Sequence, residues 1–130
     1  MAIYLAPTAP EKEYDYVIPS ETDPEVEYYC KAPDMKYQFQ LHKKYAGKTK
    51  IEKGQSTQEQ ADVYAIQLAG FDRMLVGWKG VLDKVTGEPI PCTSEIKEYI
   101  YRKHAVTLVK YIEESVFEKA REEVGLSLGN

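Results

Sequence analysis

The sequence predicts a small, mainly helical α+β protein, with three to four helices and a short β-hairpin near its N-terminus. Apolar residues recur every three or four positions along residues 61–82 and 96–124, whereas residues 14–31 hold two short Tyr- and Val-rich runs around a turn. A chain of 130 residues lies in the size range of one domain and buries about two thirds of its unfolded surface. We therefore expect a single domain over residues 1–130, with its core in residues 26–124.

The N-terminal segment, residues 1–25, is rich in proline and acidic residues, which excludes long regular structure there. We expect this segment to be partly extended. Residues 14–18 and 26–31 have the composition of strands, and residues 20–24 supply the Ser, Asp and Pro that are typical of a turn. The two strands form the predicted hairpin.

A helix is expected over residues 34–46. Pro33 and Asp34 form a helix-start signal, because proline loses nothing at the first helical position and a carboxylate favours the positive end of the helix. Gly47 ends this helix. A strand is the alternative, because apolar side chains also alternate here, at Tyr37, Phe39 and Leu41.

A basic loop, residues 48–55, leads to the helix that the sequence supports best. Ser56 and Glu59 have the spacing of a capping box, in which two side chains satisfy free amide groups at a helix start. One apolar stripe then continues for about six turns. The stripe consists of Ala61, Tyr64, Leu68, Phe71, Leu75, Trp78 and Leu82.

The last third of the chain is expected to hold a turn and one or two helices. Glycine and proline fix a turn over residues 83–91, after which Thr93 or Ser94 caps a helix. Apolar residues keep helical spacing over residues 96–124, but the stripe weakens at Lys103 and His104, where we expect a bend. Gly125 ends the helix and leaves residues 125–130 as a frayed tail.

Charge and hydropathy exclude several classes of protein. There are 17 basic and 21 acidic residues, so we expect no nucleic-acid binding, and the lysines between positions 43 and 53 form a solvated patch. No apolar run approaches the roughly 20 residues that span a bilayer, and the first residues lack the pattern of a signal peptide. We expect a cytoplasmic protein that does not enter membranes.

Catalytic and metal-binding patterns are missing from the sequence. The candidate side chains are Cys30, Cys92, His42 and His104, and no two of them have the spacing of a known metal or nucleophile motif. No glycine-rich loop is placed to hold a phosphate group. We therefore expect free thiols, no metal, no cofactor and no enzymatic activity.

Aromatic residues are the strongest candidates for a binding role, because Trp and Tyr are enriched among the residues that dominate protein interfaces. Trp78 is either a core residue that tethers a helix to the following turn or an anchor in an interface, and the core role is the commoner one. The candidate partner-binding residues are Tyr64, Phe71, Leu75, Trp78, Tyr99 and Tyr101.

Residues 75–96 carry a pattern in which an aromatic residue, Gly, Val and Asp precede a Gly-x-Pro turn and a Thr- or Ser-initiated helix. Its residues are Leu75, Gly77, Trp78, Gly80, Val81, Asp83, Gly87, Pro89, Ile90 and Thr93. This join resembles that of phage tail assembly chaperones, over residues 61–124.

The resemblance implies a largely helical, non-enzymatic protein of the infected bacterial cytoplasm. Such a protein coats the tape measure protein, recruits tail tube protein subunits to it and sometimes forms homo-oligomers. The alternative is a small phage or plasmid inhibitor that blocks a host enzyme through an acidic surface, for which residues 11–27 and 113–123 are the candidate stretches.

Overall fold

The computed structural model describes residues 2–47, 49–52, 54–58 and 62–126. It confirms the predicted fold class, a small and mainly helical α+β protein with a β-hairpin near the N-terminus. The chain forms two compact units. The sheet unit contains Met1–Pro33 and Phe71–Asn130, and the inserted unit contains Asp34–Gly70. The organisation of residues 1–130 as one domain stays a prediction.

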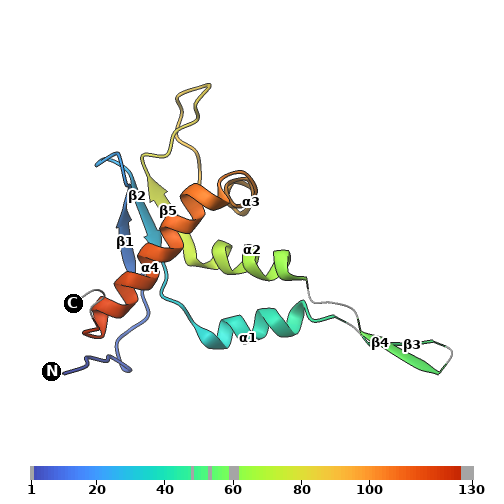
Figure 1. Cartoon of the computed structure of the whole chain (residues 1–130). Helices are drawn as coiled ribbons and strands as arrows, with labels where there is room; N and C mark the ends of the chain where they lie inside the picture. Colours follow the sequence, from blue (N-terminus) through green and yellow to red (C-terminus); the bar gives the residue numbers. More distant parts are fainter. Residues whose placement is uncertain (1, 48, 53, 59–61, 127–130) are drawn as a thin grey trace. The chain divides into compact units, whose positions relative to one another are not determined.

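The sheet unit is built on a three-stranded antiparallel sheet with the order β1-β2-β5 (Figure 1). The predicted hairpin is confirmed as β1 (Tyr16–Pro19) and β2 (Glu27–Cys30), in which Ile18 lies opposite Tyr28. Ser20 and Val26 close the turn, since the Ser20 N–H donates to the Val26 carbonyl at 3.0 Å.

The third strand, β5 (Leu75–Lys79), replaces the last turns of the predicted helix, so the expectation of one helix as far as Leu82 is wrong. Helix α2 (Val63–Met74) ends just before it. β5 pairs with β2, and Trp78 lies opposite Tyr28. Periodicity is a local signal and cannot show that a strand much earlier in the chain requires a pairing partner.

A buried lysine stabilises the change from helix to strand. Lys97 lies on α3 (Ser94–Lys103), is 7% exposed, and donates from Nζ to the carbonyls of Asp72 at 2.7 Å and Leu75 at 3.0 Å. Its ammonium group also pairs with the Asp72 carboxylate at 3.2 Å. The last carbonyls of a helix have no partner within the helix, so this cation satisfies them where the helix dipole is negative.

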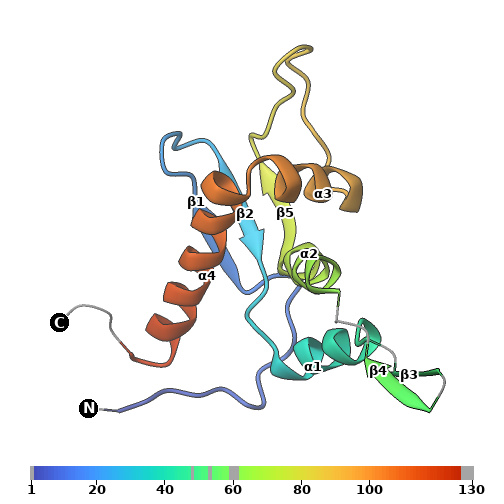
Figure 2. The same cartoon turned by 45° about the vertical axis from the view of Figure 1, so that its right-hand side comes forward.

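The core of the sheet unit lies between the sheet and its helices. Helix α4 (Lys110–Glu123) crosses one face of the sheet in both views (Figure 1, Figure 2). The buried residues of this core come from the sheet, the end of α2, α3, η1 and α4: Ile18, Tyr28, Cys30, Phe71, Leu75, Ile100, Val109, Ile112 and Val116.

The predicted helix starts, bend and helix end of the last third are confirmed. Thr93 caps α3, and the chain bends at His104 into a π-helix, η1 (Ala105–Val109), before α4. Gly125, with a φ of +87°, ends α4. The N–H groups of Gly125 and Leu126 donate to the Glu122 and Arg121 carbonyls, the two bonds of a Schellman motif.

The inserted unit contains α1 (Met35–Lys44), the strands β3 (Thr49–Glu52) and β4 (Gln55–Gln58), and the first part of α2. The prediction of a helix after Pro33 is confirmed, and its strand alternative is wrong. Asp34 caps α1 by accepting from the Tyr37 N–H at 3.2 Å, so Pro33 precedes the cap instead of opening the helix.

Two predictions within the inserted unit are wrong. The basic loop of residues 48–55 is largely a hairpin, because β3 pairs antiparallel with β4. Ser56 lies in β4 and caps no helix, whereas its expected partner Glu59 and the stripe residue Ala61 lie outside the described residues. Asp62 takes the capping role and accepts from the Ala65 N–H at 3.0 Å.

Replacement of the buried lysine tests its role. We expect Lys97→Met to lower the free energy of unfolding by about 2–4 kcal/mol, because it leaves two carbonyls without their charged donor. Urea denaturation followed by circular dichroism measures this change. Lys103→Met, at an exposed position of the same helix, is the control. Equal stability of the two variants would contradict the role given to Lys97.

Candidate functional site

The predicted partner-binding residues divide into buried and exposed positions. Phe71 and Leu75 are fully buried core residues, so neither presents its side chain at the surface. Tyr101 is partly buried, and its ring centroid lies 5.8 Å from that of Phe71. Trp78 is also partly buried and packs against the same core. The structure therefore brings these four residues together as packing.

Tyr64 and Tyr99 are the exposed members of the predicted set. Tyr99 lies on α3 with its ring 5.7 Å from that of His104 in an edge-on arrangement. Tyr64 lies on α2 within the inserted unit. Partner binding by these two residues stays a prediction.

Residues 80–91 form an arm that extends between β5 and α3 (Figure 1). Its two sides are joined by backbone hydrogen bonds, from Ile90 N–H to the Val81 carbonyl at 2.9 Å and from Asp83 N–H to the Glu88 carbonyl at 2.8 Å. The Asp83 carboxylate accepts from the N–H groups of Thr86 at 3.0 Å and Val85 at 2.7 Å. The predicted turn is thus confirmed as a cross-linked hairpin loop.

Trp78 fixes the base of the arm. Its indole Nε1–H donates to the Ile90 carbonyl at 2.7 Å, which joins the strand before the arm to the segment after it. The ring lies opposite Tyr28 on the central strand and against the core. Trp78 therefore has the predicted tethering role, with a strand in place of a helix.

Gly80 is required where the arm leaves the sheet. Its φ is +82°, and a Cβ atom at this position would lie 2.8 Å from the Glu25 carbonyl oxygen and 3.2 Å from Val26 Cγ2. A side chain would therefore force β2 and β5 apart, in addition to straining the backbone.

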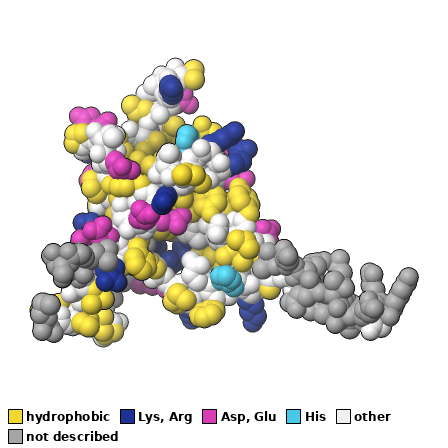
Figure 3. Space-filling view, viewed as in Figure 1, with side chains coloured by type: hydrophobic (Ala, Val, Ile, Leu, Met, Phe, Trp, Pro, Cys, Tyr) yellow, Lys and Arg dark blue, Asp and Glu magenta, His cyan; other side chains and the backbone are white. Residues whose placement is uncertain are grey.

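The arm carries two exposed apolar side chains: Val85 at its tip, which the sequence did not single out, and Leu82, which was expected on the apolar stripe of a helix. Val85 is 93% exposed, and Leu82 is also exposed. Figure 3 shows apolar and charged side chains mixed at this tip. An apolar residue inside a turn of Asp, Lys, Thr and Gly is the signal that identifies Val85, because such a turn offers it no core to enter.

The sequence candidates for a reactive centre include two cysteines, whose thiols are shielded by burial. Burial raises the pKa of the Cys30 thiol to about 12, with the nearby Cys92 thiol as the second cause, and burial also raises the pKa of Cys92. Both are free thiols, and a raised pKa keeps each in its unreactive form. Within the described residues, no three His, Cys, Asp or Glu side chains gather closely enough to hold a metal ion.

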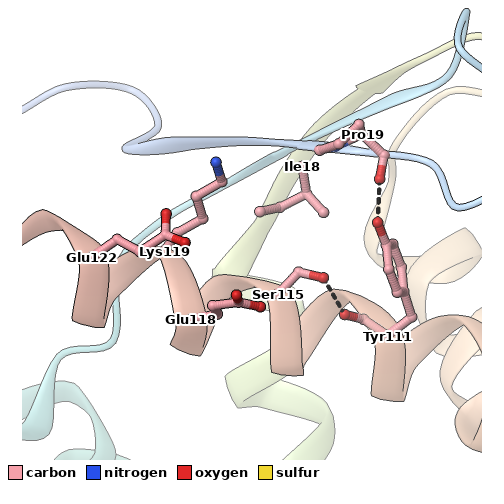
Figure 4. Close-up of a pocket in the computed structure, with 7 residues that line it drawn as sticks. All are labelled: Ile18, Pro19, Tyr111, Ser115, Glu118, Lys119 and Glu122. Atoms are coloured by element: carbon pink, nitrogen blue, oxygen red, sulfur yellow. Dashed lines mark hydrogen bonds between the residues drawn. The ribbon is translucent and has the colours of Figure 1, made fainter. Parts of the chain in front are cut away.

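A hollow of ≈ 230 Å³ lies along the seam between β1 and α4 (Figure 4). Its polar groups already hold the helix to the strand, because the Tyr111 hydroxyl donates to the Pro19 carbonyl. Farther along the seam, the Tyr16 hydroxyl donates to the Glu123 carboxylate. The hollow is lined by Ile18, Pro19, Tyr111, Ser115, Glu118, Lys119 and Glu122.

Every helix in the described part of the chain falls short of the length and apolar content needed to cross a membrane.

Comparison with protein-family models gives no match for this chain, and neither the curated proteins nor the solved structures compared with it give one.

Two substitutions of Trp78 separate its hydrogen bond from its packing. We expect Trp78→Phe to lower the free energy of unfolding by about 1 kcal/mol, through loss of the bond to Ile90. Trp78→Ala should lower it by roughly 3 kcal/mol, because it also opens a cavity against the core. Thermal and urea unfolding measure both changes, with Tyr99→Ala as an exposed aromatic control. A stable Trp78→Ala variant would contradict the tethering role.

The arm should loosen in acid. The bonds from the Thr86 and Val85 amides lower the pKa of Asp83, so the ionised carboxylate favours the folded arm. This contribution is complete above the ordinary Asp pKa of about 3.9 and is lost as pH falls through the lower folded value. Amide chemical shifts of Val85 and Thr86 report the titration. Asp83→Asn keeps an acceptor without titrating and should remove the transition; a midpoint at the ordinary value would contradict this assignment.

Proposed function

We propose that this chain is a non-enzymatic phage tail assembly chaperone, which binds the tape measure protein and recruits tail tube subunits while the virion tail assembles. The observation that carries the proposal is the arm. The residues of the chaperone-like pattern form one connected substructure, which consists of β5, the arm and the cap of α3.

The spacing of that pattern matches what the arm requires. The Trp78 indole N–H donates to the Ile90 carbonyl. Gly80 has no Cβ, so the backbone at Glu25, just before the central strand, can lie close to it. Asp83 organises the turn, and Thr93 starts the next helix. Sequences with these residues at these spacings are therefore expected to form the same arm.

The surface suits non-covalent protein binding. Large apolar side chains are exposed at separate places on the sheet unit, including Leu82 and Val85 on the arm and Phe117 on α4. Dispersed apolar contacts support binding of modest affinity, because few side chains are deeply desolvated at any one place. A chaperone that must release its client needs such affinity.

The inhibitor alternative gains no support from the charges on one face of the molecule. On the face that Figure 3 shows, acidic side chains are interspersed with Lys and Arg and with broad apolar areas. An inhibitor that imitates nucleic acid requires a concentrated acidic face.

Co-expression with the tape measure protein and the tail tube protein tests the proposal. We expect the tagged chain to retain the tape measure protein, and Val85→Asp to reduce the recovered amount about tenfold, the effect of losing roughly 1.4 kcal/mol of binding free energy. Quantitative mass spectrometry of the eluate measures this recovery. Val106→Asp, at an exposed apolar position outside the arm, is the matched control.

Failure of the unmodified chain to retain either tail protein would contradict the proposal. Recovery of a host enzyme in their place would favour the inhibitor. Equal losses for Val85→Asp and Val106→Asp would show that the arm has no special part in binding.

A further inference from the structure

Charge is divided unequally between the two units. Residues 34–70 contain six lysines and four acidic residues, whereas the rest of the chain contains 11 basic and 17 acidic residues. Helix α1 is the most basic element of the described inserted unit: its sequence, MKYQFQLHKK, has three lysines and no acidic residue. A partner of opposite charge is therefore attracted to one part of an acidic protein.

The outward side of α1 combines these lysines with exposed apolar residues. Met35 is 66% exposed and Phe39 is 69% exposed, one helical turn apart, and Lys43 follows after another turn. Lys36 is exposed beside Met35. We call Met35, Lys36, Phe39 and Lys43 the α1 face. Figure 3 shows apolar and basic side chains side by side over α1.

The opposite side of α1 accounts for the folding of the helix. Leu41 is buried there, the Tyr37 hydroxyl donates to the Ala69 carbonyl at 3.4 Å, and Asp34 caps the first turn. The α1 face contributes nothing to these contacts. Its two large apolar side chains thus remain exposed to water although the helix is already anchored.

We infer that the α1 face binds an acidic amphipathic helix of a partner protein. This inference rests on the proposed function and names the chemistry of the client segment. Apolar residues of the client helix pack against Met35 and Phe39, residue types that are enriched at interfaces and, in Met, adaptable in shape. Glu or Asp residues beside that apolar stripe pair with Lys36 and Lys43.

The chemistry of the face favours this occupant over nucleic acid. A phosphate backbone is bound by positive charge along its length, and the chain as a whole carries a net charge of −4. A short acidic helix needs only a local basic rim, and it also covers the apolar side chains that a phosphate backbone would leave in water.

Fluorescence anisotropy with the full chain and two designed peptides tests the inference. Each peptide has about 18 residues, roughly five helical turns, with Leu on one stripe. The remaining positions are mainly Glu in one peptide and mainly Lys in the other. We expect the Glu peptide to bind to the unmodified chain. Two double variants, Lys36→Glu with Lys43→Glu and Met35→Ser with Phe39→Ser, should each raise its dissociation constant about tenfold. Lys12→Glu with Lys103→Glu, at exposed sites outside the α1 face and the arm, is the matched charge control.

Three results would overturn the inference: no binding of the Glu peptide, equal binding of the Lys peptide, or displacement of the Glu peptide by an unrelated single-stranded oligonucleotide at equal concentration. Circular dichroism of each variant checks that its fold is retained. The co-expression experiment distinguishes the two proposals. If the unmodified chain retains the tape measure protein and the α1 variants retain it equally, only this inference fails. If the unmodified chain retains no tail protein, the proposed function fails.

Discussion

The buried ammonium group of Lys97 is the interaction on which the sheet unit depends most. It supplies donors to carbonyls at the end of α2, at the point where the chain changes from helical to extended backbone. Without Lys97 the Asp72 carbonyl would lose its charged donor, and the Leu75 carbonyl would keep only the long contact from the Cys92 thiol at 4.0 Å. An unsatisfied carbonyl away from water is costly. Because the donor comes from α3, the same bonds place that helix against the start of β5. One side chain thus links the end of a helix, an edge strand and the helix after the arm.

The arm inherits its position from this arrangement. β5 pairs with β2, the Trp78 indole bonds to the Ile90 carbonyl across the base of the arm, and Gly80 passes close to the backbone at Glu25. Each of these contacts joins residues that are distant along the chain or on opposite sides of the arm. The apolar tip is therefore held by a set of mutually dependent bonds, and it projects from a frame that is already ordered.

Much of this fold follows from signals between neighbouring residues. The wrong prediction in the sheet unit, one helix as far as Leu82, concerns contacts between residues far apart in the chain. The first hairpin, the cap at Thr93, the bend at His104 and the helix end at Gly125 all depend on neighbouring residues, and all were predictable; Asp34 was expected in the first turn of its helix and proved to be the cap. β5 was not, because side chains three residues apart normally lie on opposite faces of a strand, and only the register shift at Tyr29 and Cys30 places Leu75 and Trp78 opposite Cys30 and Tyr28. Of the predicted partner-binding residues, Phe71 and Leu75 proved to be core and Trp78 packs against that core, whereas a binding role for Tyr64 and Tyr99 stays a prediction. Hydrophobic character alone does not show whether a side chain faces inward or outward, and Val85 went unnoticed because its turn was judged only by its polar residues.

The hydrogen bond from the Lys31 N–H to the Met74 carbonyl, at 2.8 Å, has a topological consequence. It joins the end of β2 to the end of α2, so the chain leaves the sheet unit and returns to it at one place. The pairing of β2 with β5 then places little restriction on how many residues lie between these two points, since doubling a connecting segment costs only about 0.6 kcal/mol in closure entropy. Residues 34–70 thus occupy a position where insertions, deletions and exchange of whole segments are tolerated. Residues 34–70 can therefore change in length and sequence while the sheet and the arm are preserved.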